Sequence, residues 1–196
     1  MRKAALILLL LGATLARAAE PSNAIVLVAR PELQDAMFRA SVVVVAPLAN
    51  GAHAGFIVNH PTQTTLATLF PGHEASRRVD EPVYVGGPVM PDALFALVRA
   101  AENPGGRSFE LMPGLYAAFE EPVIDRIIEA HPESARFVAG FVAWQPGELE
   151  SEVELGAWYV MDPDSTVLAR SAAGLWEDLL KRFQRPAGFL YVGGGR

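Results

Sequence analysis

Short apolar runs recur along the chain and predict strands that are buried on both faces. Residues 24–29 (AIVLVA) and 41–46 (SVVVVA) are apolar at almost every position instead of alternating with polar side chains. Residues 55–58 and 83–85 are shorter runs of the same kind, and each ends at a sequence that favours a turn. We therefore expect a core with strands at its centre.

Other segments repeat apolar residues every three or four positions, which is typical of helices with one buried face. In residues 172–183, for example, Leu175, Leu179 and Phe183 fall on one side of a helix. Five segments are predicted as helices on this ground: residues 31–40, 62–70, 91–101, 122–130 and 172–183.

A predicted hairpin interrupts this alternation of strands and helices. Pro113 and Gly114 separate two strand-like runs, residues 107–112 and 115–119, and a Pro-Gly pair suits a tight hairpin turn. A hairpin within an alternating pattern favours an α+β fold with a mixed sheet over a doubly wound parallel sheet. The chain contains no cysteine, which agrees with a core large enough to form without disulfides.

The amino terminus has the pattern of a cleavable export signal. Arg2 and Lys3 form a basic start, residues 4–16 are mostly apolar, and Ala16 and Ala18 are the small residues that a signal peptidase requires. The apolar run is shorter than the ~20 residues that span a bilayer. We expect a signal peptide over residues 1–18 and a periplasmic or secreted mature protein.

Residues 19–196 contain no linker or repeat and are expected to form a single domain, without membrane insertion once the signal is cleaved. Loss of Arg2, Lys3 and Arg17 with the signal changes the formal net charge from −6 to −9. An acidic surface repels phosphate backbones, so nucleic acid is excluded as a partner.

Residues 137–161 (FVAGFVAWQPGELESEVELGAWYVM) join a strand, a turn, a short helix and a second strand. Gln145, Pro146 and Gly147 suit a turn with proline second and glycine third. Trp144 and Trp158 lie in the two strands, where large rings most often fill the core. The segment is thus explained by architecture.

Four glutamates crowd the short helix of this segment. Glu148 with Glu152, and Glu150 with Glu154, stand four residues apart, so each pair projects from one face. Such a pair is able to serve a hydrolase as acid and base. A solvated acidic face is the favoured interpretation, because neither pair has an apolar flank to raise its pKa.

Two other groups of residues suggest chemistry only weakly. Gly86, Gly87 and Pro88 lie between a strand and a predicted helix, as in an anion-binding loop. They lack the further residues of nucleotide-binding motifs, so a turn that needs free backbone angles is favoured. The four histidines show no metal-binding spacing, and there is no G-x-S-x-G motif. We therefore predict no metal and no cofactor.

Three segments together resemble the YqgE/AlgH family of bacterial proteins: GAHAGFIVNHP at residues 51–61, VYVGGPV at residues 83–89, and residues 137–161. The resemblance implies a bifurcated, partly barrel-like sheet wrapped by helices, and a family without a settled biochemical activity. Relatives are generally cytoplasmic, and a regulatory role has been proposed for them. This sequence departs from the family at its export signal and at His60, where relatives commonly have Arg or Lys.

For each candidate catalytic pattern, a structural explanation is favoured over a catalytic one. Together with the predicted export, this favours a non-enzymatic binding or interaction module of the cell envelope, with an unknown protein or glycan partner. The resemblance suggests where a binding cleft would form, from three segments: Asn59, His60 and Pro61; Gly86, Gly87 and Pro88; Gln145, Gly147, Glu148 and Glu150. One alternative is a hydrolase of glycans or peptides that uses Glu148 or Glu150 with His60. The other is a regulatory protein like that proposed for the cytoplasmic relatives.

Overall fold

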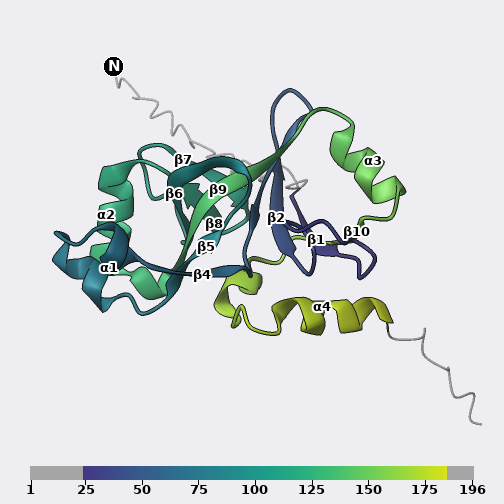
Figure 1. Ribbon diagram of the computed structural model, residues 1–196. Helices are drawn as coiled ribbons and strands as arrows, with labels where there is room; N and C mark the ends of the chain where they lie inside the picture. Colours follow the sequence, from purple (N-terminus) through teal and green to yellow (C-terminus); the bar gives the residue numbers. More distant parts are fainter. Residues whose placement is uncertain (1–23, 185–196) are drawn as a thin grey trace, which may run out of the picture.

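The computed structural model describes residues 24–184, which form a mixed α+β fold (Figure 1). In this part of the chain, ten strands build one sheet that curls into a half-barrel, and four α-helices surround it. The predicted α+β class and the partly barrel-like sheet are confirmed. The predicted signal peptide, residues 1–18, lies outside the described residues.

The first half of the sheet is antiparallel and has the strand order β10-β1-β2-β3. Its strands are β1 (Ile25–Ala29), β2 (Val42–Pro47), β3 (His53–Ile57) and β10 (Trp158–Met161). Val26 pairs with Val44 on one side and with Met161 on the other, so within residues 24–184 the last strand pairs with the first.

The second half of the sheet contains the predicted hairpin. Strand β8 lies between β6 and β7 in antiparallel pairing. Strand β4 pairs with β5, which in turn pairs with β9. The bounds are β4 (Pro61–Thr65), β5 (Pro82–Val85), β6 (Val89–Arg99), β7 (Ser108–Met112) and β8 (Leu115–Ala118).

Strand β9 (Ala135–Trp144) joins the two halves and is the point at which the sheet branches. It pairs with β6 along one edge, and on its other edge with β5 in parallel and then with β3. Gly140, at φ +74°, lies where these pairings change. A Cβ there would approach the carbonyl oxygen of Gly87 to 2.4 Å, so only glycine fits.

The helices cover different parts of the sheet. They are α1 (Leu66–Leu69), α2 (Glu121–Ala130), α3 (Glu148–Glu154) and α4 (Leu175–Gln184), with short 3₁₀ turns at η1 (Glu74–Arg78), η2 (Pro132–Ser134) and η3 (Ser165–Ala169). Figure 1 shows α1 and α2 beside the second half, and α3 and α4 around the first. Within residues 24–184, no helix combines the length and apolar character needed to cross a membrane.

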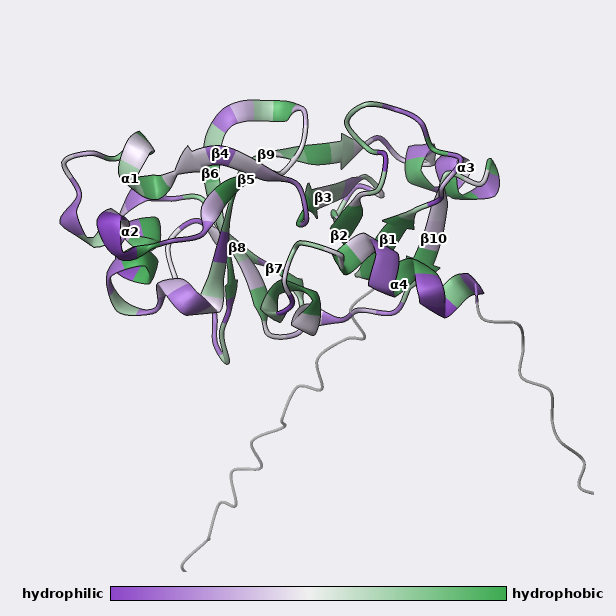
Figure 2. Ribbon diagram, turned by 60° about the horizontal axis from the view of Figure 1, so that its bottom comes forward, coloured by the Kyte–Doolittle hydropathy of each residue, from purple (hydrophilic) through white to green (hydrophobic). Residues whose placement is uncertain are grey.

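Strands β1 and β2 are buried on both faces, as their apolar runs predict. Val26 and Val44 pack in a cluster with Leu179 of α4, whereas Leu27 and Val43 pack in another with Leu149 of α3. Figure 2 shows β1 and β2 as strongly hydrophobic. The two helices therefore cover opposite faces of the same strands.

Three predicted helices are wrong in whole or in part. Residues 91–101 fall mainly in strand β6, because Phe95 and Leu97 face one cluster while Ala96 and Val98 face another. Residues 62–70 begin in strand β4 and become helical only at α1. Residues 31–40 form successive turns.

Candidate functional site: a groove beside His60

The side chain of Asn59 contacts a strained residue in the connection between β1 and β2. Its amide oxygen accepts a hydrogen bond from the backbone N–H of Val42 at 2.7 Å, and its amide nitrogen donates to the carbonyl of Ala40 at 2.9 Å. Ala40 has φ +53°, a left-handed conformation that alanine rarely adopts. Backbone strain of this kind persists only where surrounding contacts enforce it, and it concentrates at functional sites.

Residues 31–40 are compact although they are not helical. Leu33, Met37 and Phe38 pack against the core cluster beneath α3, as their spacing suggests. The carboxylate of Asp35, however, accepts hydrogen bonds from the backbone N–H groups of Met37 and Phe38, at 2.8 and 3.2 Å. Such an aspartate turn competes with a helix, which explains the wrong prediction.

This segment forms one wall of an open groove of about 480 Å³. His60 and Trp176 complete the walls, and Gln34 and Arg39 are its other polar lining residues. The indole N–H of Trp176 donates to the carbonyl of Ala29 at 2.7 Å, which fixes the ring in place. Side chains from three separate parts of the chain thus meet in a groove whose walls are fixed by hydrogen bonds within the protein.

The electrostatics of the groove depend on His60 and Arg39. Burial lowers the pKa of His60, and the nearby charge of Arg39 adds a small effect in the same direction, while the backbone of Ala40 and Arg39 acts to raise it. The imidazole is therefore neutral at pH 7. The exposed guanidinium of Arg39 forms no hydrogen bond or ion pair with another residue of the described part of the chain.

The second predicted segment lies beside the first, but its backbone is already occupied. The N–H of Gly86 donates to Ala139 at 2.7 Å, and its carbonyl accepts from Ile57 at 2.9 Å. The N–H of Val85 donates to the carbonyl of His60 at 2.8 Å. Gly86 and Gly87 pass close to β9, and Pro88 leads into strand β6, so the expected strand-to-helix turn is wrong. The glycines are explained by this close approach.

The third predicted segment lies at the opposite end of β3. Trp144, just before Gln145, pairs with His53 at the start of that strand, whereas Asn59 and His60 follow its end. At ~3.3 Å per residue, the length of the five-residue strand β3 alone separates Trp144 from Asn59 and His60 by ~13 Å. The structure therefore joins the first two segments and leaves the third apart.

The predicted turn before α3 is confirmed in detail. Gly147 has φ +83°, as the third position of such a turn requires, and the carboxylate of Glu148 accepts the backbone N–H of Gln145 at 2.8 Å. Pro61, beside His60, begins strand β4. Glu148 and Glu150 are exposed, and neither lines the groove.

Glu152 is a structural residue that the sequence did not reveal. One oxygen of its carboxylate accepts hydrogen bonds from the indole N–H groups of both Trp144, at 3.1 Å, and Trp158, at 2.7 Å. Both rings are buried, as predicted. The expectation that all four glutamates of α3 form a solvated face is thus wrong for Glu152, whose indole partners are six and eight residues away in sequence.

A serine, a histidine and a glutamate meet at η1, although sequence reasoning missed the grouping. Ser76 Oγ lies 2.7 Å from His73 Nδ1, and His73 Nε2 lies 3.7 Å from a carboxylate oxygen of Glu129. Ser76 is completely buried, so no substrate reaches its hydroxyl. The contact joins η1 to α2 and is structural.

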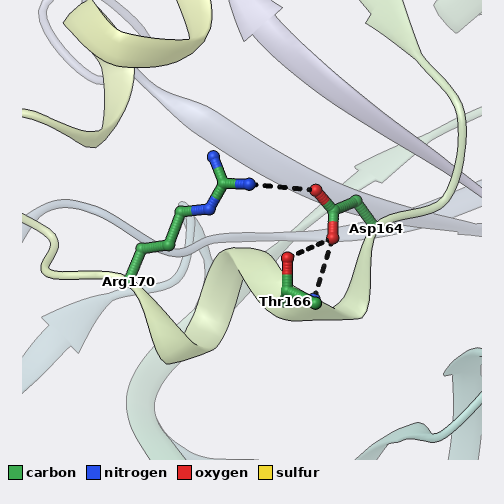
Figure 3. Close-up of polar contacts among 3 residues, drawn as sticks. All are labelled: Asp164, Thr166 and Arg170. Atoms are coloured by element: carbon green, nitrogen blue, oxygen red, sulfur yellow. Dashed lines mark hydrogen bonds and ion pairs between the residues drawn. The ribbon is translucent and has the colours of Figure 1, made fainter.

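Arg136 of β9 is buried and binds backbone carbonyls in place of a carboxylate. It donates to Val58 at 2.6 Å and to Arg170 at 2.9 Å, and its guanidinium lies 4.7 Å from the centre of the Tyr84 ring. The loop that contains Arg170 is itself stabilised by side-chain contacts. Figure 3 shows Asp164 contacting Thr166 with one carboxylate oxygen and Arg170 with the other, at 3.4 Å. Arg136 thus ties β9 to η3.

The curled sheet that branches at β9, with glycines at the crossing, defines a class of α+β protein with known structures. The solution structure of the AlgH protein from Pseudomonas aeruginosa matches with a TM-score of 0.68 at 22% identity, over 88% of this chain and 94% of that one. A crystal structure from Corynebacterium diphtheriae, protein DIP2367, matches with a TM-score of 0.66 at 23% identity, over 86% and 89%.

The sequence places the chain within one family of this class. A family model described as AlgH-like matches residues 26–187, and the chain belongs to this family. A UPF0301 protein of Anaeromyxobacter dehalogenans is 33% identical, over 86% of this chain and 92% of its own. A UPF0301 protein of Mycobacterium bovis is 30% identical, over 84% and 83%. The resemblance inferred from sequence is confirmed, and the names of these relatives state no activity.

Proposed function

We propose that this protein is a non-enzymatic binding module of the cell envelope and that its binding site is the groove beside His60. The observation that carries the proposal is the strained Ala40 at the wall of a preformed groove. Its carbonyl accepts a hydrogen bond from the Asn59 amide nitrogen, while the oxygen of the same amide accepts from the N–H of Val42. Enforced strain beside an open groove is typical of sites that are built to hold a ligand.

The positions of the carboxylates favour binding over hydrolysis. Glu148 and Glu150 are exposed and belong to the other end of β3, and Glu148 is engaged with the turn before α3. A hydrolase reaction would require one of them to face His60 across a shared cavity. The groove offers a histidine without such a carboxylate among its lining residues.

The proposal is tested by nuclear magnetic resonance on isotope-labelled protein, titrated with short peptides and with oligosaccharides. We expect chemical-shift changes confined to residues 31–40, His60 and the Trp176 indole. The change His60→Ala should weaken binding, whereas His131→Ala, at an exposed histidine beyond α2, should leave it unchanged. Shift changes centred on α3, or turnover of a probe that Glu150→Gln abolishes, would refute the proposal.

A further inference from the structure

We propose that the groove beside His60 recognises the free carboxyl terminus of a peptide, with Arg39 binding the carboxylate. This inference rests on the proposed function and names the ligand class for the same groove. It is carried by four features of the groove: a cation without a protein partner, a half-buried imidazole, a fixed aromatic ring and apolar walls.

Arg39 supplies the charge recognition. Its guanidinium is exposed at the groove and forms no bond to another residue within the described range, so its donors are free for a ligand. A guanidinium binds a carboxylate through two parallel hydrogen bonds. Arg39 is the one lysine or arginine among the lining residues of the groove. A single guanidinium suits a monoanion better than a phosphate dianion.

His60 supplies a hydrogen-bond acceptor. A neutral imidazole has one N–H and one acceptor nitrogen. His60 lines the groove and is half-buried, so its ring reaches a ligand there. Its acceptor nitrogen can receive a donor from that ligand. The last amide N–H of a peptide lies next to its terminal carboxylate and provides that donor.

The remaining walls favour a peptide over an acidic sugar. Pro31, Leu33, Ala36 and Ala40 are apolar, and Trp176 adds an aromatic ring. A sugar ring would present several hydroxyl groups to these walls, and buried hydroxyl groups without partners lose binding free energy. The apolar side chain of a terminal residue such as leucine gains from the same contacts.

The experiment compares two peptides that differ only at the terminus: N-acetyl-Ala-Ala-Leu with a free carboxylate, and the same peptide as its carboxamide. Dissociation constants are measured by nuclear magnetic resonance on protein purified from cells that express the full chain. We expect the acid to bind at least about tenfold more tightly than the amide, the effect of ~1.4 kcal/mol from a charged hydrogen bond.

Variants assign the difference to the groove. Arg39→Gln should remove the preference for the acid, and Arg99→Gln, at an exposed arginine on β6, should preserve it. Equal binding of acid and amide by the unmodified protein, or tighter binding of a uronic acid disaccharide, would overturn the peptide proposal while the groove remains a binding site. If peptides and saccharides both bind elsewhere or not at all, the proposed function fails as well.

Discussion

His60 is the residue whose environment has the clearest measurable consequence. Its pKa in the folded protein is lowered by burial, while in the unfolded chain it lies near 6.5. As the pH falls below 6.5, the unfolded chain takes up a proton that the folded protein resists. The contribution of His60 to stability is therefore complete above that pH and is lost progressively as the pH falls through the interval down to the folded pKa.

The first prediction compares unfolding free energies at pH 7.5 and pH 5 by urea denaturation. The unmodified protein should lose more stability over this interval than His60→Gln, which lacks the titrating group. His131→Gln serves as the control because His131 is three-quarters exposed, and it should follow the unmodified protein. Identical losses for His60→Gln and the unmodified protein would show that burial of the imidazole carries no cost.

At the scale of elements, Glu152 joins α3 to two strands of the sheet. Glu152→Ala would leave two buried indole donors without an acceptor, each at a cost of ~1–3 kcal/mol. We expect a loss of about 2–4 kcal/mol in the free energy of unfolding, measured by chemical denaturation. Glu154→Ala, at an exposed position of the same helix, should change it by less than about 0.5 kcal/mol.

A further prediction compares substitutions at two glycines, one of them at the branch point of the sheet. The comparison separates the cost of backbone strain from the cost of a steric clash. Gly140 and Gly147 both have φ near +80°, but a Cβ at Gly147 would meet nothing within 4 Å. Gly147→Ala should cost about 1–2 kcal/mol from conformation alone. Gly140→Ala adds a clash with the carbonyl of Gly87 and should cost about 2–5 kcal/mol. Thermal unfolding of both variants measures the difference.

Elements with a polar side, a specific turn residue or a short β-branched run, such as β1 and β2, were predictable from sequence, whereas the long strand β6 was not. Helix α2 has one apolar stripe, and Gly147 marks the turn before α3, so the helix and the turn were both predicted correctly. Strand β6 packs on both faces, so its apolar residues follow no period that separates a strand from a helix.

The candidate site was predictable only in its first part. Asn59 and His60 stood out because a turn follows a buried strand, but their partners come from distant sequence. Ala40 and Trp176 meet His60 only through the folded sheet, and no short spacing links them. The Gln145–Glu150 turn was grouped with them by family resemblance, and the antiparallel pairing of β3 with β9 places it at the other end.

At the scale of the whole molecule, the amino-terminal prediction concerns location. Expressed from its own first residue, the protein should be recovered from the periplasm with a new terminus at Ala19 or Glu20, because the small residues Ala16 and Ala18 predict cleavage there. Osmotic-shock fractionation and intact-mass measurement test this. Changing Ala16 and Ala18 to large residues should prevent cleavage. Uncleaved, unmodified protein in the cytoplasm would favour the regulatory alternative.

The pairing of β1 with β10 determines when during synthesis the sheet is completed. Strand β1 cannot pair with β10 until Met161 has been made, and β3 cannot pair with β9 until residues 142–144 have been made. Each of these two strands therefore lacks one neighbour for much of the synthesis. At ~5–20 residues per second, the roughly 100 residues between β3 and β10 take about 5–20 s. During that interval the nascent chain exposes apolar strands with unpaired edges. Because β1 pairs with β10, the sheet stays incomplete for most of the synthesis, and an incompletely folded chain is what the export predicted from residues 1–18 would require.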